Sequence, residues 1–382
     1  MPEIWLRYGG TDVVLDIRFE NLSSQVSSTF SAMPDEQAKA ALDSVPVTDN
    51  MLVLALAPSR AVAKAVVSIS EAARAKGYAA ITVDVPAKAA GALRANLAAI
   101  APADPQAAPS INRIDYQSLE ERAKKFQSTV IVSQAGFDPL FGFSGAPTAL
   151  VRTLYPEKMA EAFSARKEGN VPAPGEQGEP LKIATSAIEG VIIPAATSVE
   201  LVANGAGIAG VHAGTVQEAF SRAVEQLKAV ATVEADPVRS AIISAGSEAG
   251  THATLAGALY SLWNAAHIVR GGGSAVLLAE CREGVGGGAL QAFVEGRLKQ
   301  EQLATAQYTD GLEHLLYMQE LRQKCELGLV SSLPHYYAGA KLGFATYAGA
   351  KDALEKLLAR NGKGHKALVV SDADITLLRP RT

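Results

Sequence analysis

Residues suited to chemistry gather where an apolar run gives way to a glycine-rich loop. Thr129–Ser133 has buried-strand character, and Gly136–Thr148 beyond it holds three glycines, two prolines and three phenylalanines. Burial in such a loop raises the pKa of a carboxyl group, which makes Asp138 a candidate catalytic proton carrier. Ser144 and Thr148 stand before an expected helix, whose free N–H groups favour ligands, and are candidate substrate-binding residues. A packed structural loop is the alternative.

A second loop, Glu280–Gly288, joins a buried-strand pattern to a helical one. Its backbone N–H groups are placed to bind an anion or a carboxylate. Glu280 is a candidate catalytic proton carrier and Arg282 a candidate substrate-binding residue; an internal ion-pair cluster is the alternative. Cys281 has either a thiol pKa lowered by Arg282 or the inert character of a buried cysteine. The loop lacks G-x-G-x-x-G and G-x-x-x-x-G-K-[ST] spacing, so neither a dinucleotide site nor a P-loop is predicted.

Two further side chains are candidates by their position or chemistry. Arg60 follows a buried strand and opens a helix, from which it can clamp a substrate carboxylate; an exposed arginine of the first turn is the alternative. His252 is a third candidate proton carrier. The six histidines include no His-x-x-x-His pair, and no Cys-x-x-Cys pair occurs, so no metal site is predicted. Gly142–Ala146 approximates a nucleophile elbow, but the strand ends too early for a serine hydrolase.

Composition and charge exclude several functional classes. The chain has 382 residues, a net charge of −4 and a pI near 5.9, without a basic cluster interleaved with aromatic residues, so no nucleic-acid partner is predicted. Two cysteines cannot form a disulfide framework, and Met1–Gly10 has no signal-peptide pattern. Met51–Ala57, the most apolar run, is too short to span a membrane. We expect a cytoplasmic protein whose partner is a small carboxylate-bearing molecule; the sequence leaves its oligomeric state open.

Alternating strand and helix patterns predict an α/β fold with parallel-rich sheets. A hairpin is expected over Ile4–Ile17, and Arg166–Pro180 is expected to be a long loop; the sequence leaves open whether this loop acts as a lid. The length favours two domains, here 1–212 and 236–382, joined by a connecting helix over 213–235. Strands are expected at 51–57, 80–85, 129–133, 191–194, 199–202, 241–244, 275–279, 327–331 and 367–371, with helices at 36–42, 60–76, 87–100, 215–231, 255–269, 289–299, 312–324 and 351–360.

Several short stretches together resemble the nickel-dependent lactate racemase (LarA-like) family over nearly the whole chain. They are Tyr8-Gly9, the Arg60 turn, Phe141-Gly142-Phe143-Ser144-Gly145, Ser244-Ala245-Gly246, Gly271-Gly272-Gly273 and Ala279-Glu280-Cys281-Arg282-Glu283-Gly284, in the order found in that family. The resemblance implies two α/β domains with a ligand cleft between them. It also implies a nickel-pincer nucleotide tethered to a lysine, a histidine that ligates the nickel, and two histidines that exchange the substrate's proton.

The functional residues of the family are largely replaced in this chain. The catalytic histidine of the central loop falls on Asp138 and the tethering lysine on Thr148, and no histidine precedes His212. The family's substrate-facing Tyr-Gln-x-x-Lys aligns with Ala256–Tyr260, which makes Tyr260 a candidate substrate-binding residue by resemblance. Of the family's set, Arg60 remains. The resemblance therefore implies a divergent member without the residues that attach the nickel-pincer nucleotide, and its cofactor is unknown.

Three functions are compatible with these residues. The first is a repurposed isomerase, a racemase or epimerase, in which Arg60 anchors a hydroxy acid or sugar acid and Asp138, Glu280 or His252 carries protons. The second is a non-catalytic binding or regulatory protein that keeps the ligand cleft. The third is a nickel-cofactor racemase with a different tether. A cleft filled by the loop's phenylalanines favours the second, and a pocket where Asp138, Arg60 and the Glu280 loop converge favours the first.

Overall fold

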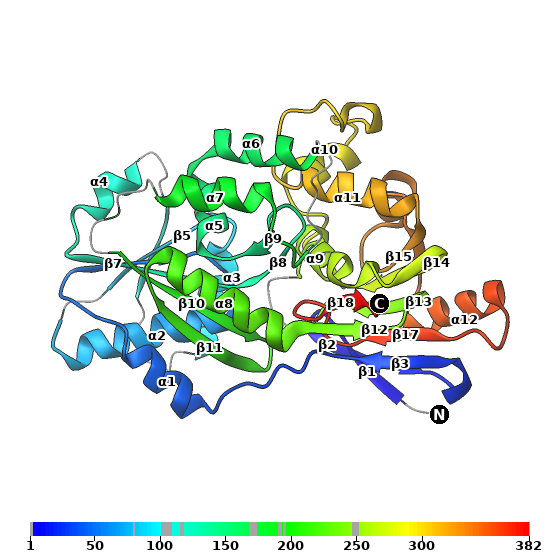
Figure 1. Cartoon of the computed structure of the whole chain (residues 1–382), viewed down its shortest axis with the longest axis horizontal. Helices are drawn as coiled ribbons and strands as arrows, with labels where there is room; N and C mark the ends of the chain where they lie inside the picture. Colours follow the sequence, from blue (N-terminus) through cyan, green and yellow to red (C-terminus); the bar gives the residue numbers. More distant parts are fainter. Residues whose placement is uncertain are drawn as a thin grey trace. The chain divides into compact units, whose positions relative to one another are not determined.

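A computed structural model describes residues 3–78, 81–100, 109–114, 118–167, 174–189, 193, 196–246 and 252–381 of the chain (Figure 1). The chain forms two compact units, one of Phe30–Val230 and one of Met1–Thr29 with Ala231–Thr382. We call them the middle unit and the discontinuous unit. Each is built on a six-stranded sheet rich in parallel pairs, which confirms the predicted α/β class.

The sheet of the middle unit has the strand order β11-β10-β7-β4-β5-β6. The pairs from β10 to β6 are parallel, and β11 adds an antiparallel edge. β4 is buried at every residue, as expected for a strand covered on both faces. The strands are β4 (Met51–Ala55), β5 (Thr82–Val85), β6 (Ser110–Arg113), β7 (Ser128–Gln134), β10 (Ala196–Asn204) and β11 (Gly207–Gly214).

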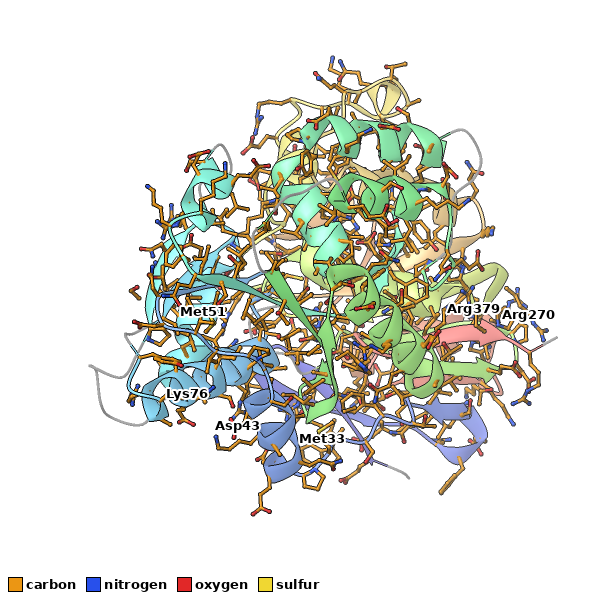
Figure 2. All side chains as sticks on the ribbon, turned by 60° about the vertical axis from the view of Figure 1, so that its left-hand side comes forward. Met33, Asp43, Met51, Lys76, Arg270 and Arg379 are labelled. Carbon is orange, nitrogen blue, oxygen red and sulfur yellow. The ribbon has the colours of Figure 1, made fainter. Side chains whose placement is uncertain are left out.

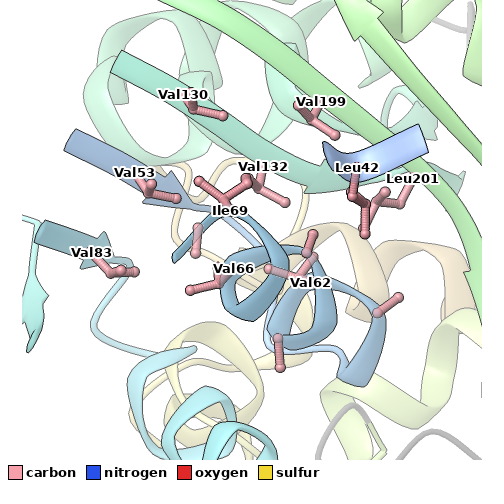
Figure 3. Packing of buried hydrophobic residues seen from close by; sticks show 14 of the residues in the cluster. Leu42, Val53, Val62, Val66, Ile69, Val83, Val130, Val132, Val199 and Leu201 are labelled. Carbon is pink, nitrogen blue, oxygen red and sulfur yellow. The ribbon is translucent and has the colours of Figure 1, made fainter. Parts of the chain in front are cut away.

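Helix α2 (Arg60–Ala75) shows how local sequence places the helices of this unit. Ser59 caps it by accepting a hydrogen bond from Val62 N at 3.1 Å. Val62, Val66 and Ile69 share one face and pack in the core with strand valines (Figure 3). Polar residues such as Asp43 and Lys76 are exposed (Figure 2). The other helices are α1 (Asp35–Asp43), α3 (Ala90–Ile100), α4 (Leu119–Ala123), α5 (Ala146–Leu154), α6 (Pro156–Lys167), α7 (Glu179–Glu189) and α8 (Val216–Ala231).

The sheet of the discontinuous unit has the strand order β16-β15-β14-β13-β17-β3, and all of its pairs are parallel. A hairpin of β1 (Glu3–Tyr8) and β2 (Thr11–Asp16) confirms the predicted one. β12 (Thr232–Ala235) pairs with β18 (Leu377–Pro380). The strands of the sheet are β3 (Leu22–Val26), β13 (Val238–Ser244), β14 (Val269–Leu278), β15 (Cys325–Val330), β16 (Ala345–Tyr347) and β17 (Ala367–Val370).

Helices of the discontinuous unit follow the predicted pattern closely. They are α9 (Leu255–Ala266), α10 (Gly288–Val294), α11 (Leu312–Arg322) and α12 (Ala350–Asn361), with short helical turns at η1 (Phe19–Asn21), η3 (Gln300–Gln302) and η4 (Tyr336–Lys341). Residues of the hairpin, of β14 and of α12 meet in one apolar core. No helix in the described ranges is both long enough and apolar enough to cross a bilayer.

The two units differ from the predicted domains, 1–212 and 236–382 with a connecting helix over 213–235. The first 29 residues group with the C-terminal part, because β3 pairs with β17 and the apolar residues of the hairpin enter that unit's core. The predicted connecting helix is α8, and its residues as far as Val230 belong to the middle unit.

The loop predicted over Gly136–Thr148 also contains regular structure. β8 (Gly136–Asp138) and β9 (Gly142–Ser144) form a short antiparallel hairpin, and α5 begins within the predicted loop. Of the strand predicted at 191–194 only residue 193 is described, and it is not in a strand, whereas residues 168–173 of the loop predicted at 166–180 fall outside the described residues. The described ends of that loop are helical, since α6 ends at Lys167 and α7 begins at Glu179.

Candidate functional site

Three parallel strands of the discontinuous unit end in one group of polar loops. Ligands in open α/β sheets bind beyond the carboxyl ends of the strands. Here the main chain joins the ends of β13, β14 and β17: Ala245 N donates to Leu278 O at 3.0 Å, and Ala373 N donates to Ser244 O at 3.2 Å. We call the polar side chains of these loops the strand-end site; they are Tyr8, His252, Glu280, Asp372 and Asp374.

His252 has the imidazole of this site. Its side chain is 8% exposed, and Nδ1 lies 3.4 Å from Gly257 O. Nε2 is buried and has no hydrogen-bond partner in the part of the chain that the structure describes, while Asp374 Oδ2 lies 3.9 Å away. An Nδ1–H that donates to Gly257 leaves the lone pair on Nε2, where the Asp374 carboxylate would stabilise an accepted proton. This geometry suits a general base.

Two carboxyl groups follow β17. The Asp374 carboxylate lies in the space that a Cβ on Gly246 would fill, and Gly246 has a φ of +93°. Burial raises the pKa of Asp372 above its ordinary value; the nearby Asp374 charge raises it further, and Arg7 opposes both. Asp372 therefore keeps its proton to higher pH than an exposed aspartate, which suits a group that returns a proton to a substrate.

Glu280 joins the site through the turn between β1 and β2. Ser244 Oγ donates to Arg7 O at 2.8 Å, which fixes the end of β1 beside the end of β13. The Glu280 carboxylate packs against Gly9, whose φ of +61° and missing Cβ make the contact fit. Burial, and then the charges of Cys281 and Glu280, raise the pKa of Tyr8, so its phenol stays protonated near neutral pH.

Cys281 has the inert character that was one of its two predicted alternatives. The side chain is 1% exposed, and burial raises the pKa of its thiol to about 12. Its φ of 53° lies in the left-handed region, which is unusual for a residue with a side chain. Strain of this kind at a strand end marks a loop whose path is fixed by its surroundings.

The loop after β14 lies beside the residues that lead into α9. Glu283 N donates to Ala253 O at 2.8 Å, and Leu255 N donates to Gly284 O at 3.0 Å. The structure therefore brings the predicted candidates Glu280 and His252 into one cluster of loops. Arg282, on the same loop, is exposed.

Tyr260 lies on α9 and packs edge-on against His314 of α11. The two ring centroids are 5.0 Å apart, and His314 Nδ1 accepts a hydrogen bond from Trp263 Nε1 at 2.9 Å. These contacts place Tyr260 at a packed helix interface. They favour a structural role over the substrate contact that the resemblance implies.

In the middle unit, Asp138 holds its own loop together. Asp138 is 1% exposed, and its Oδ1 accepts hydrogen bonds from Leu140 N at 2.7 Å and Phe141 N at 2.9 Å. Arg152 Nη2 forms an ion pair with Oδ2 at 3.0 Å. The predicted proton carrier is thus a buried carboxyl group paired with Arg152, and these contacts hold it in the structure of its own loop.

Thr148 caps helix α5. Its hydroxyl donates to Gly145 O at 3.1 Å and accepts from Gly145 N at 3.0 Å, and its side chain is 1% exposed. Ser144 lies on β9, partly exposed, with its hydroxyl over Gly136. The Thr148 hydroxyl is therefore used in capping the helix, whereas the Ser144 hydroxyl takes no part in that cap.

Glu200 is a buried acid that was not predicted. It lies on β10 opposite Ser133 of β7, and its two carboxyl oxygens accept from Ala146 N at 3.0 and 3.2 Å. Burial raises the pKa of Glu200 to about 7, although the hydrogen bonds from Ala146 and Ser133 oppose that shift. A single charged residue within an apolar strand pattern was the available signal.

Arg60 is the first residue of α2 and is exposed. Its predicted position after a buried strand and at the start of a helix is confirmed. Ser59 makes the capping hydrogen bond there, so the Arg60 side chain is not the cap of α2.

Asp372 and Asp374 were also missed from the sequence. The signal was present, because Ser371-Asp372-Ala373-Asp374 directly follows a predicted buried strand. Tyr8 was missed as a titrating group because its neighbours come from residues 280 and 281, far along the chain.

Comparison with known proteins supports one fold for the chain. No family model and no curated protein sequence matches it. The chain is structurally similar to the lactate racemase apoprotein of Thermoanaerobacterium thermosaccharolyticum, with a TM-score of 0.72, 14% identity, and coverage of 99% of this chain and 100% of the other. A Thermotoga maritima protein gives a TM-score of 0.66 at 10% identity, covering 91% of this chain and 99% of the other. The chain thus has the fold of lactate racemase along its whole length.

Proposed function

We propose that this chain is a diverged isomerase of the lactate racemase superfamily that acts on a small hydroxy acid or sugar acid. The observation that carries the proposal is the buried His252 imidazole, with an unbonded Nε2 beside Asp374 at the ends of parallel strands. A buried nitrogen without a partner costs free energy, so it calls for a functional explanation. The similarity to a lactate racemase apoprotein supports the reaction class.

The nickel-pincer nucleotide of the resembling family does not fit the residues present. Thr148 stands where the tethering lysine is expected, and its hydroxyl is buried and bonded to the Gly145 backbone. Asp138 stands where a catalytic histidine is expected, and its carboxylate is paired with Arg152. We therefore assign no step to that cofactor.

The proposed proton transfer uses residues of the strand-end site. His252 Nε2 accepts a proton from a carbon of the substrate, the electron pair of the C–H bond stays on the substrate, and Asp374 stabilises the imidazolium. Protonated Asp372 returns a proton to the same carbon, which gives the other stereoisomer if it acts from the opposite face. Burial, which raises the pKa of Asp372, supports this second role.

Arg60 is retained as the proposed anchor for a substrate carboxylate. Its guanidinium is exposed at the start of α2, where a planar cation can form two hydrogen bonds to a carboxylate. Arg60→Ala tests this role separately from proton transfer, because it should weaken acid binding and leave the His252 environment intact.

A non-catalytic small-molecule-binding protein is the second candidate function. The contacts of Asp138 and Thr148 favour this candidate. By the resemblance, these positions would hold the catalytic histidine and the tethering lysine, but here Asp138 pairs with Arg152 and Thr148 bonds to the Gly145 backbone, and both contacts stabilise the fold. The two candidates differ in one observable. An isomerase exchanges a carbon-bound hydrogen of its ligand with solvent, and a binding protein does not.

Proton exchange tests the proposal directly. The protein is incubated in D₂O with a panel of 2-hydroxy acids and sugar acids, and loss of the C–H signal is followed by NMR. His252→Gln should slow exchange at least about 100-fold, because it removes the base, whereas His212→Gln is the matched control in the middle unit. Exchange that survives His252→Gln contradicts the assignment, and ligands that bind without exchanging support the second candidate.

A further inference from the structure

A cavity of about 570 Å³ lies beside the edge strand β16 of the discontinuous unit. Its size is within the range of small-molecule sites. It borders the edge of the sheet, whereas Asp372 and Asp374 follow β17, four positions away in the strand order. Its walls include Glu326, His335, Phe344, Tyr347, Lys356 and Arg360.

Glycines make room for the side chains around this cavity. A Cβ on Gly339 would lie 3.3 Å from the His335 ring, and one on Gly343 would lie 2.7 Å from Arg322 Nη2. Gly339 and Gly343 flank the end of η4, a rare π-type turn in which Leu342 N donates to Tyr337 O at 2.9 Å. Such turns occur frequently at functional sites.

Two cations of the cavity wall form ion pairs with carboxylates. Lys356 pairs with Asp352 at 2.9 Å, and Arg360 pairs with Glu326 at 2.8 Å. These two cations are therefore already matched by carboxylates at the rim.

Arg322, a third cation near the cavity, forms no ion pair with a carboxylate among the described residues. It lies directly behind the Gly343 wall, with its guanidinium carbon 6.0 Å from the centre of the Phe344 ring. Its Nε and Nη2 are buried and have no hydrogen-bond acceptor within the described residues. Burial without a carboxylate lowers the pKa of Arg322. Buried guanidinium nitrogens are normally hydrogen-bonded, so these two unsatisfied donors call for a functional explanation.

We propose that this cavity binds a small organic anion through its carboxylate or phosphate group. Arg322 supplies the uncompensated positive charge behind the wall, and Lys356 and Arg360 supply adjustable cations at the rim. The faces of Phe344 and Tyr347 offer apolar surface for the remainder of the ligand. This second site is independent of the proposed isomerase reaction.

Thermal shift and calorimetric titration test the proposal on the full chain. The probes are inorganic phosphate and succinate, each compared with chloride at the same ionic strength, so that the two arms distinguish the phosphate group from the carboxylate group. We expect a saturable rise in Tm with at least one probe. Arg322→Met should raise the Kd for that probe about 10-fold to 100-fold, because the unpaired charge is lost while the side-chain stem remains.

Two controls make the result specific. Lys351→Gln changes an exposed cation of α12, the helix that also carries Lys356 and Arg360. Lys351 does not line the cavity, so this variant should leave the Kd unchanged. If Arg322→Met does not fold, the double variant Lys356→Gln/Arg360→Gln takes its place and should also weaken binding. A response no larger than that to chloride, or one that survives these substitutions, overturns the proposal. His252→Gln should not alter it, which separates this site from the strand-end site.

Discussion

Glu200 couples the stability of the middle unit to pH through one carboxyl group. Burial raises the pKa of folded Glu200 to about 7, above its ordinary value of 4.5. The protonated form is therefore favoured by folding, and its contribution is fully present below pH 4.5. This contribution is lost as pH rises through about 7, because the folded chain must then keep an ionised carboxylate buried away from water.

Glu200→Gln should remove this pH dependence. Between pH 5 and pH 8 the unchanged protein should lose up to about 3 kcal/mol relative to the variant, which keeps a hydrogen-bond acceptor for Ala146 without a charge. The measurement is the Tm of both proteins at the two pH values. Glu225→Gln, at an exposed position of α8, is the control and should follow the unchanged protein. Equal pH profiles for Glu200→Gln and the unchanged protein would refute this explanation.

At the scale of elements, the β1–β2 turn positions the Glu280 loop. Gly9→Ala should destabilise the discontinuous unit by about 1–3 kcal/mol, because it places a Cβ in a left-handed conformation and against the Glu280 carboxylate. Gly10→Ala is the matched control, since no atom lies within 4 Å of a Cβ there. Denaturant unfolding of the three proteins measures the difference. Equal stability of the two alanine variants would show that the contact at Gly9 does not hold the loop.

Local sequence signals predicted most helices and strands, whereas strand pairs between distant parts of the chain were not predicted. The helix predicted over 60–76 rests on an apolar spacing that is readable within 20 residues, and the structure has α2 at that place, with its apolar face in the core. The pairing of β3 with β17 joins residues more than 300 positions apart. In β3, three polar residues, Ser23, Ser24 and Gln25, stand between Leu22 and Val26, so its sequence has no apolar strand pattern. No local sequence pattern predicts an edge strand of this kind.

The candidate site followed the same division. Position after a strand found Glu280, and residue chemistry found His252. The loop at Asp138 was predicted from its composition, but its ion pair with Arg152 was not, because a helical turn must first bring the arginine back to the loop. Residue type therefore indicated where polar groups gather, and packing decided which of them remain available for chemistry.

For the molecule as a whole, the chain has the fold of a lactate racemase apoprotein, and the reaction that we propose for it does not use the nickel cofactor that the sequence resemblance implies. Thr148 caps a helix and Asp138 pairs with Arg152, so both positions now stabilise the chain. The proposed reaction therefore depends on the chain's own His252, Asp372 and Asp374. This is the central claim, and it can be tested without knowledge of the substrate.

The most direct test measures nickel content by elemental analysis together with the intact mass under denaturing conditions. The protein is purified from cells that carry the genes for synthesis of the nickel-pincer nucleotide. We expect no stoichiometric nickel and the unmodified mass of the 39.8 kDa chain. Stoichiometric nickel with a nucleotide-sized mass adduct would contradict the account, because another residue would then tether the cofactor.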